Sequence, residues 1–232
     1  MRTPVASQST GGRTDRKEPP SGGGYSLGEE IANSITHGAG LVASIAGAAL
    51  LLFIVARHHD PLWLAADAVY AASLIILYTA STLYHAIPNR RAKRVFRVMD
   101  HAAIYVLIAG TYTPFALLNL RGAWGWALSA GAWALAVIGV IFTALIRHRL
   151  SRATTVIYVA MGWMGVIAAK PAFDHLSAWA IIWLLGGGLL YTAGTLFYAW
   201  ERLRYGHAIW HVFVLGGSIC HYVAVLRYAR PS

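Results

Sequence analysis

The stretch EEIANSITHGAGLVASIAGAALLLFIV, residues 29–55, decides the fold. Beyond its first third it is almost wholly apolar, and about 20 apolar residues are enough for a helix to cross a bilayer. Its ionisable side chains, Glu29, Glu30 and His37, all lie near its first end. Charge inside a membrane helix is costly and is kept mainly where it has a function or a buried partner. The stretch therefore predicts a membrane helix with a polar site near its first end.

Six further apolar stretches follow, separated by short connections. The whole chain of 232 residues is 57% hydrophobic and only 12% charged, which is too apolar for a soluble domain of this size. We therefore predict an all-α integral membrane protein, a seven-transmembrane-helix bundle formed by residues 25–232. The predicted spans lie at about 29–55, 63–87, 98–119, 123–146, 153–172, 177–199 and 207–228.

The distribution of basic residues predicts the orientation of the bundle. Residues 1–24 are rich in Gly, Ser, Thr and Pro and are too polar to form a core, so we expect a disordered cytoplasmic tail. Most of the 19 Lys and Arg lie in this tail and after the second, fourth and sixth spans. The positive-inside rule then predicts the N-terminus in the cytoplasm and the C-terminus outside. This pattern explains the net charge of +10 without a nucleic-acid partner, and it also suits contact with anionic lipid.

Histidines at the predicted cytoplasmic ends of the second and seventh spans indicate a metal site. His207 and His211 are four residues apart, so one helical turn places both imidazoles on one face. His85 ends the second span at the same depth. Zinc in catalytic sites commonly takes three protein ligands and leaves a position for water, so we predict that His85, His207 and His211 bind Zn²⁺. The alternative is a set of bundle-facing histidines that hydrogen-bond neighbouring carbonyl or hydroxyl groups.

Asp100 and Ser81 are the predicted catalytic residues. Asp100 begins the third span at the depth of the histidines, and Ser81 lies one turn before His85. Asp100 can hydrogen-bond a water at the zinc ion and act as general base, and Ser81 can orient a ligand or bind developing negative charge. The alternative for Asp100 is a surface carboxylate paired with Arg97 or Arg94.

Four more polar residues are expected to support the site without binding the metal. Glu30, Asn33 and His37 lie on one face of the first span, and three histidines already suffice as ligands. The alternative for Glu30 is an interfacial cap, because negative charge is favourable near a helix start. His101 points about 100° away from Asp100 around a helix, so we expect it to pack or hydrogen-bond between helices.

The ordered motifs carry a resemblance to a known family. They are E-x-x-N-x-x-x-H at 30–37, S-x-x-x-H at 81–85, M-D-H at 99–101 with AGTYTPF at 109–115, and H-x-x-x-H at 207–211. Together they resemble the haemolysin III branch of the progestin and adipoQ receptor (PAQR) superfamily, over essentially residues 25–228. The resemblance implies a seven-helix membrane fold with zinc near the cytoplasmic face. It also implies that His85, His207 and His211 hold the ion, with Asp100 on the zinc-bound water.

The resemblance also suggests functions. It links adiponectin receptors to ceramide hydrolysis and bacterial members to membrane lipid homeostasis. Our leading hypothesis is zinc-dependent hydrolysis of a lipid amide or ester, with membrane lipids as substrate or ligand. The alternatives are a non-catalytic membrane sensor with structural zinc, and a cytolytic activity, for which a multispan integral protein is poorly suited. The short loops argue against reception of a protein hormone and fit a multi-pass protein of the bacterial plasma membrane.

Overall fold

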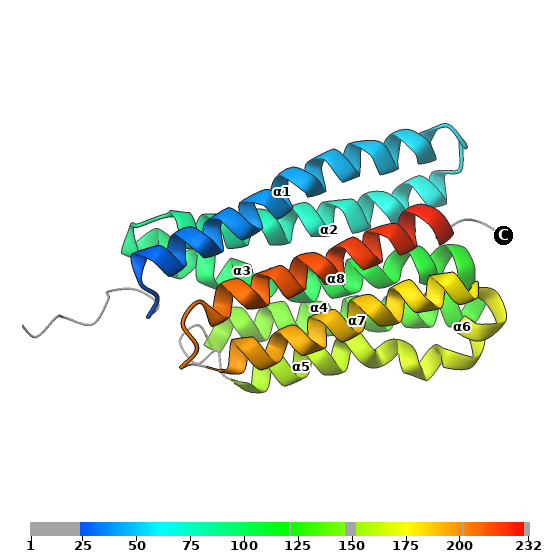
Figure 1. Ribbon diagram of the computed structural model, residues 1–232. Coiled ribbons are helices and arrows are strands. Elements are labelled where there is room, and N and C mark those ends of the chain that lie inside the picture. The colour runs from blue at the N-terminus through cyan, green and yellow to red at the C-terminus, as the bar shows by residue number, and fades with distance from the viewer. Residues whose placement is uncertain (1–23, 121, 147–151, 201, 230–232) are drawn as a thin grey trace, which may run out of the picture.

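The computed structural model describes residues 24–120, 122–146, 152–200 and 202–229. Within these residues, seven helical runs are long and apolar enough to cross a membrane, which confirms the predicted seven-helix fold. Figure 1 shows them packed side by side in one bundle. The tail predicted over residues 1–24 lies outside the described part of the chain, apart from Gly24. The elements are α1 (Leu27–Ala56), α2 (Pro61–Ala86), α3 (Arg90–Pro114), η1 (Phe115–Leu120), α4 (Gly122–Ile146), α5 (Arg152–Gly162), η2 (Trp163–Ala168), α6 (Ala169–His175), α7 (Ala178–Ala199) and α8 (Gly206–Tyr228).

Side-chain caps determine where the first two helices begin. The Ser26 hydroxyl accepts a hydrogen bond from the Glu29 backbone N–H, while the Glu29 carboxylate accepts one from the Ser26 backbone N–H. This reciprocal capping box satisfies donors that the first helical turn leaves free. At the start of α2, Asp60 accepts two backbone N–H bonds, and Pro61 occupies the first helical position. The caps thereby fix the residue at which each of these helices begins.

The third and fifth spans each combine several helix types. α3 begins at Arg90, about two turns before the span predicted near residue 98, because Asn89 caps it and its first turns are basic rather than apolar. Pro114 carries no N–H group, and the chain continues past it as the π-helical turn η1. The fifth span runs through α5, the 3-10 segment η2 and α6. Hydropathy detects a span but not these changes in helical pitch.

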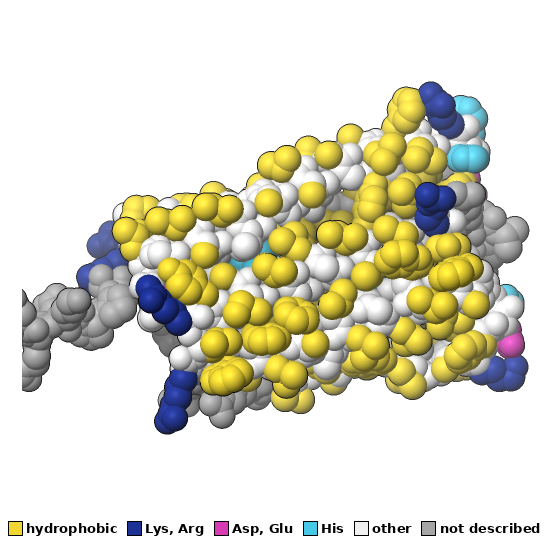
Figure 2. All heavy atoms as spheres, viewed as in Figure 1, with side chains coloured by type: hydrophobic (Ala, Val, Ile, Leu, Met, Phe, Trp, Pro, Cys, Tyr) yellow, Lys and Arg dark blue, Asp and Glu magenta, His cyan; other side chains and the backbone are white. Residues whose placement is uncertain are grey.

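The packing of α2 and α8 against α1 determines where the site lies. α2 lies along α1 and α3, and α8 lies along α7 and α1. As a result, the last turn of α2 and the first turns of α8 meet beside the first turns of α1. We call this the site end of the bundle. Figure 2 shows hydrophobic side chains covering the visible face between the two ends, with Lys and Arg gathered at the ends, as a membrane-spanning protein requires.

Candidate metal centre

The structure brings His85, His207 and His211 together at the site end. One potential ligand nitrogen from each lies within 4.8 Å of those of the other two, and all three side chains are buried. α2 supplies His85 from its last turn, and α8 supplies the other two from its first turns. A tetrahedral zinc ion with bonds of about 2.1 Å separates its nitrogen ligands by roughly 3.4 Å. Small side-chain rotations would therefore bring the three nitrogens around one ion.

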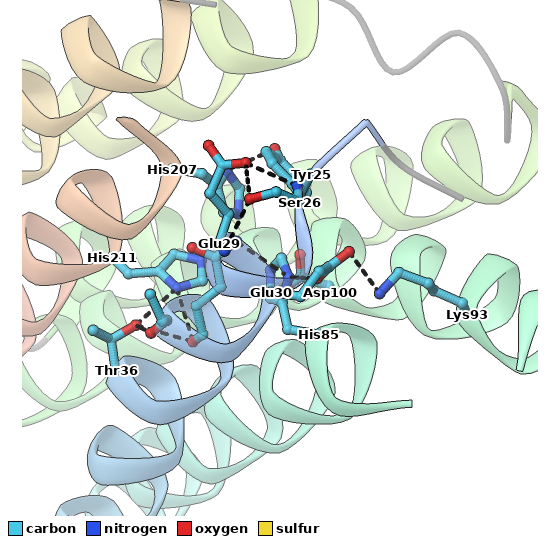
Figure 3. A network of polar contacts seen from close by, with 12 residues as sticks. Tyr25, Ser26, Glu29, Glu30, Thr36, His85, Lys93, Asp100, His207 and His211 are labelled. Carbon is cyan, nitrogen blue, oxygen red and sulfur yellow. Dashed lines mark hydrogen bonds and ion pairs between the residues drawn. The ribbon is translucent and has the colours of Figure 1, made fainter. Parts of the chain in front are cut away.

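α1 and the residues just before it contact the Nδ1 atom of every histidine in the cluster. Glu30 Oε2 lies 2.7 Å from Nδ1 of His85, and the Tyr25 hydroxyl lies 3.0 Å from Nδ1 of His207. The Asn33 carbonyl and the Thr36 hydroxyl each lie 3.3 Å from Nδ1 of His211. Figure 3 shows Glu30 and Thr36 of α1, and Tyr25 just before it, beside the histidines. α1 and the residue pair before it, which supply none of the three histidines, therefore contact all of them.

These contacts decide which ring nitrogen is free to bind a metal. A carboxylate and a backbone carbonyl only accept hydrogen bonds, so Nδ1 of His85 and of His211 donates, and Nε2 of each ring carries the lone pair. The Tyr25 hydroxyl can accept from His207 in the same way. All three Nε2 atoms are buried without a hydrogen-bond partner among the described residues. Buried, unbonded imidazole nitrogens on three rings that lie this close together fit a metal ion as their missing partner.

Glu30 connects this cluster to α3. Its second carboxylate oxygen, Oε1, lies 2.8 Å from Nζ of Lys93, and both side chains are largely buried. The Lys93 ammonium also lies 5.1 Å from the centre of the Tyr84 ring. Glu30 is therefore a bridge between a cation on α3 and a histidine on α2. Its role goes beyond the interfacial cap that was the alternative reading of the sequence.

Asn33 and His37 take different positions beside the cluster. Asn33 is fully buried, and its amide nitrogen lies 3.4 Å from Nδ1 of His85. The His37 ring stacks on that of His211, with ring centres 3.4 Å apart and planes 13° apart. It also packs nearly perpendicular to the Tyr78 ring, with ring centres 5.0 Å apart. His37 thus packs against a histidine of the cluster and is not a member of the group that could hold the ion.

Asp100, Ser81 and His101 lie on the α3 side of the cluster. Asp100 is buried and makes no ion pair with Arg97 or Arg94, unlike the surface carboxylate of the alternative reading. The fully buried Ser81 lies next to it. His101 Nδ1 donates to the Arg97 carbonyl at 2.8 Å, while the His101 carbonyl accepts from the Tyr158 hydroxyl. The His101 side chain is therefore bonded within α3, while its backbone carbonyl is bonded to α5.

A cavity of about 320 Å³ adjoins this group. Asp100, His101 and His37 line it at the site end, and Leu120 and Phe173 line it towards the opposite end. Between them the lining is mostly apolar side chains of α3, α5, α7 and α8. The site thus lies at one end of an apolar space that runs along the bundle.

Three contributing residues were not predicted as site residues. Tyr25 lies just before α1, where burial raises the pKa of its phenol well above the ordinary value, so the hydroxyl stays neutral beside His207. Lys93 belongs to a run of basic residues that indicated topology alone, and Thr36 belongs to an otherwise apolar stretch. The sequence offers a signal for Thr36, because it follows Asn33 by three residues and so lies on the same face of the helix. Nothing local distinguishes Lys93 from the arginines around it.

Comparison with known proteins agrees with the motif resemblance. A family model described as "Haemolysin-III related" matches residues 25–222. The chain is 45% identical to Hemolysin-3 of Bacillus cereus over 204 residues, which cover 88% of this chain and 93% of that protein. It is 41% identical to the Hemolysin-3 homolog of Bacillus subtilis (strain 168), covering 88% and 96%. A more distant relative is the heptahelical transmembrane protein ADIPOR2 of Oryza sativa, 30% identical over 72% of this chain and 82% of that protein.

Proposed function

The chain belongs to the haemolysin-III-related family, and we propose that it hydrolyses a lipid amide or ester with the help of a zinc ion in its bundle. One observation carries this proposal. Three imidazoles with unbonded, buried Nε2 atoms cluster at the site end, and the buried carboxyl group of Asp100, beside Ser81 one turn from His85, lines the end of an apolar cavity. A metal, a general base and a space for an acyl chain are what such a hydrolysis needs.

His85, His207 and His211 would hold the ion, and their Nδ1 contacts with α1 would keep each ring in the required tautomer. Zinc, when bound, supplies a Lewis acid that polarises the carbonyl and activates water. No other side chain of the cluster is needed for binding, because three protein ligands leave one position open.

Asp100 and Ser81 would carry the proton and the developing charge. A carboxylate oxygen of Asp100 takes the proton from the water that attacks the carbonyl carbon, and then gives it to the leaving nitrogen or oxygen. The bond between the carbonyl carbon and that atom breaks, which yields a fatty acid and an amine or alcohol. The Ser81 hydroxyl can donate a hydrogen bond to the negative charge that develops on the carbonyl oxygen. The apolar cavity would hold the acyl chain away from water.

Metal content tests the ligand set directly. We expect elemental analysis to find zinc in the purified wild type, and to find little in His85→Ala, His207→Ala or His211→Ala. His221→Ala should retain the metal, because its Nε2 donates to the Leu184 carbonyl on α7 and lies outside the cluster. Full zinc content in the first three variants would contradict the proposed site.

Turnover of a fluorescent ceramide-like amide and of its ester counterpart tests the reaction. Zinc-loaded wild type should release the labelled fatty acid, and His211→Ala should not. Asp100→Asn should keep its zinc and lose at least about 100-fold in rate, the size of a general-base contribution. Equal rates for wild type and His211→Ala would exclude hydrolysis at this site. Full activity in Asp100→Asn would remove Asp100 from the reaction.

A further inference from the structure

One face of α3 changes from charged to apolar along its length. Asp100, Ile104, Leu107 and Thr111 all line the cavity, in steps of about one helical turn. Arg97 lies one turn before Asp100 on the same face, about 4.5 Å along the axis at helical rise. The face therefore presents a guanidinium, then a carboxyl group, then an apolar wall. A membrane lipid has the same order of charged headgroup, linkage and chain.

Arg97 is a cation without a bonded partner among the described residues. Its side chain is half-buried, yet it makes no hydrogen bond or ion pair there. Its charge acts on the neighbouring Tyr25, Tyr84 and Asp100. By contrast, Lys93 on the same helix is paired with Glu30, and Arg94 points outward and is exposed. Arg97 is thus the one unpaired basic side chain of this helical segment that borders the site.

A half-buried guanidinium without a partner is suited to an oxyanion. Arginine binds phosphate and carboxylate groups through two parallel N–H bonds, and it is desolvated more readily than lysine. Arg97 lies one helical turn before Asp100, where the lining of the cavity begins, so an oxyanion bound to Arg97 can belong to the molecule whose chain occupies the cavity. In a glycerophospholipid the phosphate lies only a few bonds from an acyl ester, which matches one helical turn between Arg97 and Asp100.

We propose that Arg97 binds the anionic phosphate headgroup of the lipid whose acyl chain enters the cavity, so that the substrate class is an acidic phospholipid. The identification of this lipid as a substrate rests on the proposed function. Binding of the lipid at Arg97 does not depend on turnover. It assigns to Arg97 a role in selectivity, separate from the general attraction of basic residues for anionic membranes.

Binding of two matched probes tests this assignment with the purified full-length protein in neutral detergent. The probes are phosphatidic acid and diacylglycerol with the same fluorescent acyl chain, which differ only in the phosphate. Wild type should bind phosphatidic acid about tenfold more tightly than diacylglycerol, as expected for a charge-assisted hydrogen bond. Arg97→Gln should lose most of that preference while its affinity for diacylglycerol stays the same. Arg97→Lys should keep part of the preference because it keeps the charge.

The matched control is Arg94→Gln, which removes an equal charge from the exposed side of the same helix. It should leave the preference unchanged. An equal loss in both variants, or an unchanged preference in Arg97→Gln, would overturn the inference in favour of a diffuse basic surface. Displacement of phosphatidic acid by equimolar inorganic phosphate would overturn the lipid assignment. An Arg97-dependent preference in a protein that hydrolyses neither probe would contradict the claim that the bound phospholipid is the substrate, and it would leave this binding site standing.

Discussion

Each histidine of the cluster uses its two ring nitrogens for different purposes. Nδ1 of His85, His207 and His211 is bonded to Glu30, Tyr25 and Asn33, whereas Nε2 of each is buried and unbonded among the described residues. A hydrogen bond on one nitrogen sets the tautomer and raises the basicity of the other. The residues before and within the first turns of α1 should therefore influence metal affinity without touching the metal.

Tyr25→Phe removes a single hydroxyl from this arrangement. His207 Nδ1 then loses its partner at 3.0 Å, and we expect zinc affinity to fall about 10- to 100-fold. Competition with a fluorescent zinc chelator measures the change. Tyr205→Phe is the matched control, because that ring lies at the same end and packs against Gly28 rather than a histidine. An unchanged affinity in Tyr25→Phe would show that the hydroxyl does not orient the ligand.

Glycines permit the close helix contacts that hold the site. A Cβ atom on Gly40 of α1 would lie 2.6 Å from the Tyr78 ring of α2 and 2.8 Å from Leu215 of α8. Small residues at such points let membrane helices approach each other closely. The Tyr78 ring in turn contacts His37, which stacks on His211. The interface of α1, α2 and α8 is therefore connected to the cluster through two aromatic contacts.

Gly40→Ala should overpack this interface. We expect it to destabilise the protein by about 1–3 kcal/mol, because the added Cβ atom would lie only 2.6 Å from the buried Tyr78 ring, which must then shift. Gly186→Ala is the control, since nothing lies within 4 Å of a Cβ atom there. That variant should be neutral or more stable by up to about 1 kcal/mol, owing to the higher helix propensity of alanine. Thermal unfolding in detergent compares the two, and equal midpoints would contradict the packing argument.

At the scale of the whole molecule, the charges and the apolar surface define how the bundle would sit in a membrane. Large apolar side chains such as Val42, Ile138, Ile167 and Leu189 are exposed along the length of the helices. Lys and Arg lie at the two ends of the visible face, as Figure 2 shows. The bias of basic residues towards the site end predicts that this end faces the cytoplasm.

Reporter fusions test that orientation. Alkaline phosphatase attached after Ser232 should be active, because it needs an oxidising compartment to form its disulfides. Green fluorescent protein attached at the same position should not fluoresce after export, whereas a fusion at the N-terminus should. A fluorescent C-terminal fusion with inactive phosphatase would reverse the predicted topology, and it would place the histidine cluster near the outer surface.

The sequence by itself was sufficient for the fold, the family and the identity of the clustered histidines. Long apolar stretches indicate membrane helices because of the cost of placing polar groups in lipid, and the HxxxH spacing puts His207 and His211 on one face by helical geometry alone. These are local properties of a helix. Residues 29–55 and their six counterparts therefore predicted the bundle without knowledge of how the helices pack.

Only the tertiary structure decided how the site is supported. Glu30 joins Lys93 to His85, and Tyr25 contacts His207 across 182 residues of sequence. No periodicity reports such contacts, because they depend on how far each helix extends and how it is rotated against its neighbours. The Arg97 side chain, which has no bonded partner in the described part of the chain, and the cavity beside Asp100 arise in the same way. Helical geometry acts within one segment, whereas pairing, burial and cavities exist only between segments.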